Sequence, residues 1–129
     1  MRLGYVLIYV PDVAATVAFY EKAFGLSRRF VDDSGQFGEM ETGGTALGFV
    51  AESLAEGNAM AVHRNRLDEA PAGSEVAFVA EDVAEAYARA VAAGALAVAP
   101  PKSKPWGQIV AYVRDRNGFL VEICSEVAG

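Results

Sequence analysis

The sequence predicts an α+β fold in which two βαβββ modules form a curved eight-stranded sheet around a concave cleft. First, the stretch YVLIYVPDVAATVAFYEKAFGL at residues 5–26 returns in altered form as EVAFVAEDVAEAYARAVAAGA at residues 75–95. Second, each copy is followed by strand-like runs that Gly-Gly or Asn-Gly turns separate, as in β-hairpins. Third, 129 residues with 53% hydrophobic content suit one domain, or two half-domains with a shared core.

The first module is predicted to occupy residues 1–52. It opens with the strand-like run YVLIYV, whose side chains alternate between two apolar faces. Asp12 can accept hydrogen bonds from the first free amides of a helix, and Gly25 can end that helix with a positive φ. Between them, one helical stripe is formed by Val13, Val17, Tyr20 and Phe24. The runs RFV, FGEMET and TALGFVA then read as three strands.

The second module is predicted to occupy residues 74–129 and to repeat this order. Asp82 and Glu85 form a capping box at the start of a helix, and Gly94 ends it. Strands are expected at residues 95–98, in QIVAYVR and in FLVEIC, with PPKSKPWG as a loop after the first of them. The segment 53–73 has no clear period and is interpreted as a linker with one helical turn near its start.

Duplication has a physical reason in this architecture. A βαβββ unit covers one face of its sheet with its helix and leaves the other face bare, so two units bury more surface by placing their sheets together. The result is a concavity lined by both halves, which is the usual place for a ligand. Strand alternation assigns twelve side chains to this inner face: Tyr5, Leu7, Tyr9, Ala46, Gly48, Val50, Glu75, Ala77, Val79, Leu120, Glu122 and Cys124. Several of them are small and leave room, unless bulky neighbours such as Tyr9 fill it.

Composition excludes several classes of function. The formal net charge of −6 and the scattered Lys and Arg residues argue against a nucleic-acid-binding surface. An acidic surface favours cationic small molecules, although solubility explains it equally well. Cys124 is the one cysteine, so an internal disulfide is excluded and a cytoplasmic location is favoured. No apolar run approaches the roughly 20 residues that span a membrane, and the N-terminal run lacks a signal-peptide cleavage site.

Two longer motifs point to a known family. They are D-V-x-x-x-x-x-F-Y-x-x-x-F-G-L at residues 12–26 and P-W-G-Q-x-x-x-Y-V-R-D-x-x-G-x-x-V-E-I at residues 105–123. With the doubled βαβββ order, they resemble the vicinal oxygen chelate superfamily of glyoxalase I, bleomycin-resistance proteins and extradiol dioxygenases. The resemblance covers essentially the whole chain, and it reports the fold rather than the activity, because this fold hosts many chemistries.

The resemblance also implies where a metal would be held. Enzymes of this superfamily use four inward-facing ligands, and the matching positions here are Tyr5, Gly48, Glu75 and Glu122. Gly48 offers no donor and a tyrosine pKa near 10 disfavours a phenolate, so we expect no metal and no other cofactor. A divalent metal, if present, would be held by Glu75 and Glu122, although zinc, nickel and iron(II) prefer imidazole. The only histidine, His63, is expected to be a solvated linker residue.

The two glutamates are unusual in apolar strands, where an unpaired charge is costly to bury. They can be satisfied by the hydroxyls of Tyr5 or Tyr9, by water, by a metal or by a cationic ligand, and one of two close carboxylates can hold a proton. Trp106 can stack on a planar or cationic ligand from its loop or pack against the domain edge, and Phe37 has a comparable position. No catalytic residue is predicted. The predicted ligand-binding residues are Tyr5, Tyr9, Phe37, Gly48, Glu75, Trp106 and Glu122.

The favoured interpretation is a metal-independent protein, similar to the bleomycin-resistance branch, that binds and sequesters an aromatic or cationic small molecule. The resemblance implies a homodimer, because two chains commonly build the clefts together in that branch. Nucleic acid and membranes are not expected as partners. The alternative is a metal-dependent lyase, isomerase or dioxygenase resembling glyoxalase I or an extradiol dioxygenase. A third interpretation is a paralogue whose cleft has lost its ligand.

Overall fold

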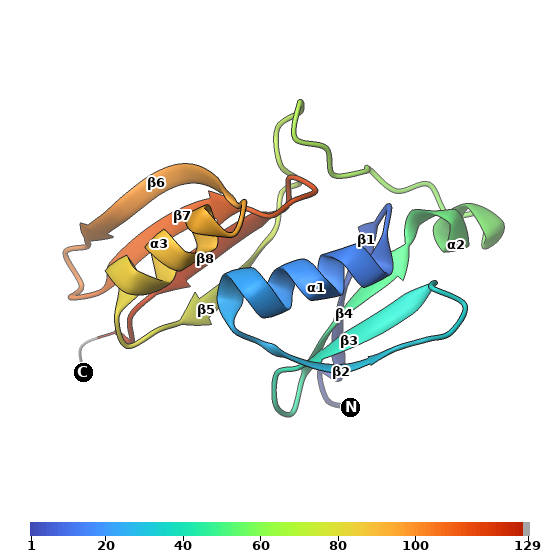
Figure 1. The fold of residues 1–129 in the computed structure, drawn as a ribbon, viewed down its shortest axis with the longest axis horizontal. Helices are drawn as coiled ribbons and strands as arrows, with labels where there is room; N and C mark the ends of the chain where they lie inside the picture. Colours follow the sequence, from blue (N-terminus) through green and yellow to red (C-terminus); the bar gives the residue numbers. More distant parts are fainter. Residues whose placement is uncertain (128–129) are drawn as a thin grey trace. The chain divides into compact units, whose positions relative to one another are not determined.

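The computed structural model of the protein describes residues 1–127. It contains two compact units, Met1–Asn65 and Arg66–Gly129, here called unit 1 and unit 2. Each unit has its own four-stranded sheet and its own long helix (Figure 1). The predicted α+β class and the doubled βαβββ order are therefore confirmed, while a single sheet around a shared cleft stays a prediction. No helix within residues 1–127 has the length and apolar character needed to cross a membrane.

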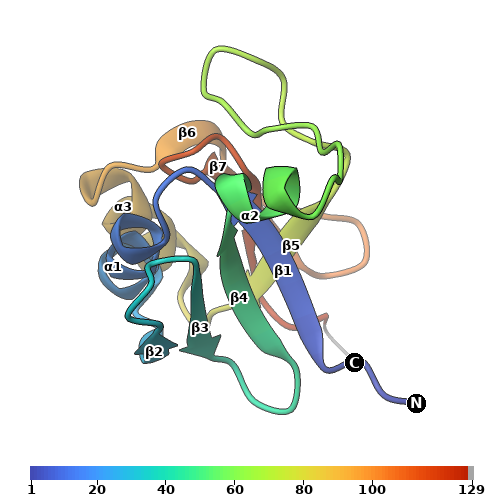
Figure 2. The ribbon, with the colours of Figure 1, turned by 90° about the vertical axis from the view of Figure 1, so that its right-hand side faces the viewer.

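Unit 1 follows the predicted order of elements and adds a short helix at its end. Its strands and helices are β1 (Tyr5–Val10), α1 (Val13–Phe24), β2 (Ser27–Val31), β3 (Phe37–Glu41), β4 (Ala46–Ala51) and α2 (Glu52–Gly57). The sheet has the order β1-β4-β3-β2, with β1 parallel to β4 and the remaining pairs antiparallel (Figure 2). Helix α2 lies where one helical turn was expected, at the start of the segment interpreted as a linker.

The limits of α1 follow from its two end residues. Asp12 accepts a hydrogen bond from the amide of Ala15 at 3.0 Å, which satisfies one of the free donors of the first turn. Gly25 has a φ of 69° and donates its amide to the carbonyl of Glu21 at 3.0 Å. The predicted apolar stripe packs on the sheet, where the ring of Tyr20 lies 4.7 Å from that of Phe49.

Unit 2 repeats this arrangement. Its elements are β5 (Glu75–Val79), α3 (Val83–Ala92), β6 (Leu96–Ser103), β7 (Ile109–Arg114) and β8 (Leu120–Cys124). The sheet order is β5-β8-β7-β6, again with the first pair parallel. Asp82 caps α3 by accepting from the amide of Glu85 at 3.0 Å, and Gly94 follows the helix with a φ of 109°. The predicted N-cap at Asp82 is thus confirmed, and the helix ends with Ala93 as its C-cap residue, directly before Gly94.

Strand β6 differs from its prediction. We expected a strand at residues 95–98 and a loop through the prolines, whereas β6 continues to Ser103. The prolines are tolerated because β6 is an edge strand, so one side of its backbone needs no ladder partner. Its pairing with β7 also shifts register twice between Ala97 and Lys102, which bends the strand around the proline pair.

Each sheet has one face against its helix and one face turned away from it, here called the open face. In unit 1 a Cβ on Gly38 would meet Val13 and Val17 of α1, so Gly38 and its neighbour Phe49 define the helix side. Tyr5, Leu7 and Tyr9 alternate with the buried Ile8 and Val10, and they therefore lie on the open face. In unit 2 Val113, Val121 and Ile123 are buried on the helix side. Tyr112 and Glu122, which alternate with them along β7 and β8, lie on the open face.

Candidate functional site

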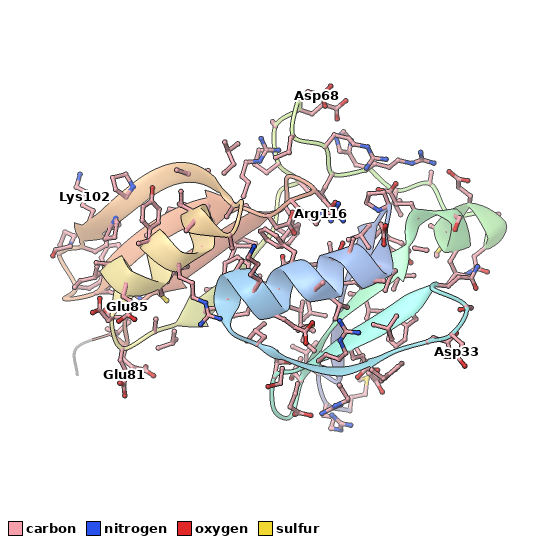
Figure 3. The ribbon with its side chains drawn as sticks, in the orientation of Figure 1. Asp33, Asp68, Glu81, Glu85, Lys102 and Arg116 are labelled. Carbon is pink, nitrogen blue, oxygen red and sulfur yellow. The ribbon has the colours of Figure 1, made fainter. Side chains whose placement is uncertain are left out.

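The open faces hold most of the residues that the sequence assigns to a ligand site. In unit 1 they are Tyr5, Tyr9, Phe37 and Gly48. In unit 2 they are Glu75 and Glu122, with Trp106 in the loop at one end of the sheet. Figure 3 shows the side chains on both sheets.

Two carboxylates share the open face of unit 2 on neighbouring strands. In the parallel pair β5–β8, Glu122 lies beside Ala77, and Glu75 is two residues before Ala77 on the same side of the strand. Strand spacing and rise place the two Cα atoms about 8 Å apart, within reach of one another's long side chains. Glu75 is exposed and Glu122 is half-buried.

Tyr112 of β7 fixes one of these carboxylates. It lies directly opposite Glu122 in the antiparallel pair, and its hydroxyl donates a hydrogen bond to Oε1 of Glu122 at 2.8 Å. Sequence reasoning named Tyr5 and Tyr9 for this role and missed Tyr112. Residue-by-residue pairing across the Asp-Arg-Asn-Gly turn would have found it, because that pairing places Tyr112 against Glu122 on one face.

The ionisation of these groups reflects their proximity. The hydrogen bond to Glu122, followed by burial and the charges of Glu122 and Glu75, raises the pKa of Tyr112 to about 12. Partial burial and then the charge of Glu122 raise the pKa of Glu75 above its ordinary value. The three groups therefore interact electrostatically, as expected of ionisable side chains that lie close together on one face of a sheet. We call these three residues, Glu75, Glu122 and Tyr112, the acidic floor.

The acidic floor has no built-in cation. Within residues 1–127 neither Glu75 nor Glu122 has an ion-pair partner. Arg114 follows Tyr112 on the same face of β7, but its donors are committed elsewhere: Nε donates to the carbonyl of Gly118 at 2.9 Å, and the other nitrogens donate to linker carbonyls. The two carboxylates are thus left with an unbalanced negative charge.

Arg114 forms a clasp at one end of this face. Its Nη1 donates to the carbonyl of Leu67 at 3.3 Å, and its Nη2 donates to those of Arg66 and Glu69 at 3.0 and 2.7 Å. Arg114 is only 9% exposed, so these bonds are made largely away from water. The clasp fixes the chain that leads into β5, the strand that carries Glu75.

Trp106 lies at the opposite end of the face. Its indole Nε1 donates to Oε1 of Gln108 at 2.8 Å, and Nε2 of Gln108 donates to the carbonyl of Ser125 at 3.1 Å. Gln108 also interacts with the thiol of Cys124, whose pKa is raised by burial and then by Glu122. The indole is therefore anchored through its N–H while 56% of the residue stays exposed, which leaves ring surface for stacking.

The end of β5 also borders two open hollows of about 460 and 410 Å³. The first is lined by Val79, Ala80, Glu81, Ser125 and Glu126. The second is lined by Glu81, Asp82, Val83, Ala84, Pro101, Lys102, Ser103 and Ile109. The first adjoins the open face at Val79, at the end of the sheet where Gln108 connects Trp106 to the carbonyl of Ser125.

On the open face of unit 1, neighbouring side chains cover Gly48. A Cβ on Gly48 would meet Cδ2 of Leu7 at 2.8 Å and Cε1 of Phe37 at 3.3 Å. The ring of Phe37 also contacts that of Phe30, with centroids 5.7 Å apart. Of the two alternatives for Gly48, the structure supports the filled one, with Leu7 and Phe37 rather than Tyr9 as the covering residues.

Sequence reasoning also missed Glu39, which is buried on the open face of unit 1. It pairs with Gly48 in register and is 6% exposed. The guanidinium of Arg29 lies 3.3 Å from Glu39 and 2.8 Å from Glu41, and it bridges the two carboxylates. Unlike the acidic floor, this carboxylate has a counter-ion within its own unit.

Comparison with known proteins identifies the family. The Glyoxalase/Bleomycin resistance protein/Dioxygenase superfamily matches residues 2–123. The chain belongs to this superfamily. A glyoxalase-related enzyme from Fulvimarina pelagi is 24% identical, with a TM-score of 0.81 over 97% of this chain and 88% of that one. A glyoxalase/bleomycin resistance protein/dioxygenase family enzyme from Burkholderia phytofirmans PsJN is 23% identical, with a TM-score of 0.81 over 99% and 100%.

A third solved structure, TioX from Micromonospora sp. ML1, is 24% identical, with a TM-score of 0.72 over 97% of this chain and 98% of that one. A comparison with curated proteins gives no match. At these identities the solved structures establish the fold alone. The predicted family resemblance is confirmed, whereas the chemistry must be argued from the residues of this chain.

The four positions that correspond to the superfamily's metal ligands do not supply a matching donor set. Tyr5 and Gly48 lie in unit 1, and Gly48 has no side chain. Glu75 and Glu122 lie in unit 2, and one oxygen of Glu122 already accepts from Tyr112. Within residues 1–127 no three His, Cys, Asp or Glu side chains gather as a metal site would require. Two carboxylates without imidazole are a poor site for zinc, nickel or iron(II).

Proposed function

We propose that this superfamily member is a metal-independent binding protein that sequesters a small amphipathic molecule with a cationic group and an aromatic part. The observation that carries the proposal is the acidic floor, in which Glu75 and Glu122 have no cation partner within the described chain. Glu122 is half-buried and lies near a second carboxylate, so its charge is unfavourable, and a bound cation offsets that cost.

The surroundings of the acidic floor suit an amphipathic ligand. Ala77 and Val79 are exposed aliphatic neighbours on β5, and Leu120 is half-buried beside Glu75 on β8. Trp106 offers an exposed indole at the end of the same face. Apolar walls with a few placed polar groups are typical of small-molecule sites. The net charge of −6 would also attract a cation towards the protein.

Homodimeric assembly and a cytoplasmic location are part of the same proposal. The first rests on the likeness to the bleomycin-resistance branch of the superfamily, and the second on the single cysteine in the sequence. Sedimentation of the purified chain tests the assembly, since a monomer at micromolar concentration would contradict it.

The binding function is tested by isothermal titration with a panel of cationic aromatic molecules. Glu122→Gln should weaken binding of a cationic probe about tenfold, as expected when one charge-assisted contact is lost. Trp106→Ala should weaken binding of any probe that stacks on the indole. Glu85→Gln is the matched control, because Glu85 is an exposed acid on α3 and the substitution changes the net charge equally (Figure 3).

The metal-dependent alternative predicts a different outcome. If the chain is a lyase, isomerase or dioxygenase of this superfamily, protein purified without chelators should carry nickel, zinc, manganese or iron in near-stoichiometric amounts. Elemental analysis measures this directly. Such a metal, lost in the double variant Glu75→Gln/Glu122→Gln, would overturn the metal-independent proposal.

A further inference from the structure

The geometry of the acidic floor points to a narrower ligand class, and this inference rests on the proposed function. We propose that Glu75, Glu122 and Tyr112 select cations that carry N–H donors, such as primary ammonium or amidinium groups, over quaternary ammonium groups. In this scheme Glu75 and Glu122 contact the ligand, and Tyr112 is a positioning residue that holds Glu122.

The carboxylate oxygens of Glu75 and Glu122 are the hydrogen-bond acceptors of the floor. Oε1 of Glu122 accepts from Tyr112 at 2.8 Å, and the thiol of Cys124 also interacts with this carboxylate. Glu75 is exposed. The floor therefore presents carboxylates from two neighbouring strands, and within residues 1–127 that of Glu75 has no protein donor. Directional acceptors of this kind reward a cation that can donate two or more hydrogen bonds.

The residues beside the two carboxylates do not form an aromatic cage. Quaternary ammonium groups have no N–H and are recognised chiefly by aromatic faces. The register neighbours of the two glutamates are Leu120 and Ala77, which are aliphatic. The nearest aromatic residue in register is Tyr112, and its hydroxyl is directed at Glu122. Trp106 lies beyond the end of β8, so it suits the body of a ligand rather than its charged end.

Unit 1 contains an example of two carboxylates that bind one cation with N–H donors. In unit 1 the carboxylates of Glu39 and Glu41 meet an N–H cation, the guanidinium of Arg29, at 3.3 and 2.8 Å. Nε of Arg29 also donates to Glu41 at 2.9 Å. Glu39 occupies the place in β3 that Tyr112 occupies in β7, since each faces the middle residue of the last strand. Unit 1 thus provides its own N–H cation, whereas unit 2 leaves that position for a ligand.

Three probes of similar size test the selectivity: benzylammonium, benzamidine and benzyltrimethylammonium. Titration of the full chain, followed by calorimetry or by backbone amide NMR shifts, gives their affinities. We expect the two N–H probes to bind at least about tenfold more tightly than the quaternary probe, the difference that one charge-assisted hydrogen bond makes. Equal affinities would overturn the selectivity and leave a cation site. Failure of all three probes to bind would instead remove the proposed function.

Variants then test the individual roles. Glu75→Gln should reduce the difference between benzylammonium and benzyltrimethylammonium, because it removes one charged acceptor at an exposed position where folding is not at risk. Tyr112→Phe should weaken benzylammonium binding about fivefold and benzyltrimethylammonium binding much less. Glu85→Gln on α3 is the control and should leave the ratio unchanged. A parallel loss of both probes in Tyr112→Phe would mean that Tyr112 does not position Glu122 for N–H donors.

A measurement without ligand tests the hydrogen bond between Tyr112 and Glu122. The hydrogen bond to Glu122, followed by burial and the neighbouring charges, raises the pKa of Tyr112 to about 12, so that tyrosine should stay largely un-ionised below pH 11 in the parent protein. In Glu122→Gln its pKa should fall towards 10.0, the ordinary value for tyrosine. The carbon-13 shift of the Tyr112 ring, followed by NMR from pH 8 to pH 11, gives the answer. The same titration curve in both proteins would contradict the pairing.

Discussion

The two open faces have the same backbone and opposite side-chain chemistry. In unit 1 Leu7 lies beside Gly48 and covers it. In unit 2 the corresponding pair is Ala77 beside Glu122, so the small side chain lies on the edge strand and the long polar one lies on the inner strand. This exchange closes one face and opens the other. The same backbone thus carries a covered glycine in one unit and an uncovered carboxylate in the other.

Charge shows the same contrast. The buried carboxylate of unit 1, Glu39, meets Arg29 within its own sheet, whereas the carboxylate of unit 2, Glu122, meets the neutral hydroxyl of Tyr112 and the thiol of Cys124. The last open-face position of β3 is Glu41, and that of β7 is Arg114. The arginine of unit 2 is therefore directed at the linker carbonyls and not at a carboxylate.

The largest expected effect comes from removing the clasp that only unit 2 has. Arg114→Ala should lower the free energy of unfolding by about 3 kcal/mol, because it leaves several carbonyls without their charged donor in a buried place. Arg116→Ala, at an exposed position two residues further along the chain (Figure 3), is the matched control and should change stability by less than about 0.5 kcal/mol. Urea denaturation measures both.

Arg114→Lys sharpens this test, because a lysine keeps the charge and loses the planar set of donors. It should recover less than half of the lost stability. Full recovery would show that the positive charge matters and that the contacts to Leu67, Arg66 and Glu69 do not.

The next effect compares two glycines, one in each turn between the last two strands of a unit. Gly43 and Gly118 have φ values of +94° and +99°, so alanine is strained at both. A Cβ on Gly43 meets nothing within 4 Å, whereas one on Gly118 would lie 2.8 Å from the carbonyl of Arg66 and from Nη2 of Arg114. Gly118→Ala should cost about 3 kcal/mol and Gly43→Ala about 1 kcal/mol. Equal losses in thermal unfolding would show that the clasp adapts to the extra carbon.

The elements of both units could be predicted because local signals decide them. Asp12 and Asp82 each cap a helix as expected, since a cap depends on three or four neighbouring residues. Strand β6 was predicted too short because Pro100 and Pro101 normally end a strand, and only the edge position of β6 permits them. That position is a property of the sheet and is not visible in the local sequence.

The candidate site was predicted less completely, for a related reason. Glu75 and Glu122 were found because a charge in an apolar strand is conspicuous in the sequence. Tyr112 and Glu39 were missed because their roles depend on cross-strand register, which sequence alternation alone does not give. Leu7 was assigned to the correct face, but its cover over Gly48 depends on a side-chain direction that only the structure shows.

The difference between the two open faces is tested by placing a covering leucine in unit 2, where Ala77 lies beside Glu122. Ala77→Leu places in unit 2 the residue that covers Gly48 in unit 1, and Ala77 is exposed, so folding should be preserved. The larger side chain should shield Glu122 and weaken benzylammonium binding about tenfold, equivalent to about 1.4 kcal/mol. The mirror substitution Leu7→Ala should leave the affinity unchanged. Unchanged binding in Ala77→Leu would place the ligand away from Glu122.

The smallest expected effect is the pH dependence that Glu75 adds to stability. Its pKa is raised in the folded protein, first by partial burial and then by Glu122, so the folded state binds this proton more tightly than the unfolded state does. The resulting stabilisation is present below the unfolded value of 4.5 and is lost as the pH rises through the raised pKa. Glu75→Gln should therefore gain stability relative to the parent across this window, by well under about 1 kcal/mol because the group is exposed and screened. Glu122→Gln removes only the second cause and should reduce the slope without abolishing it. Parallel pH profiles of unfolding in the parent and Glu75→Gln would show that the floor does not perturb Glu75.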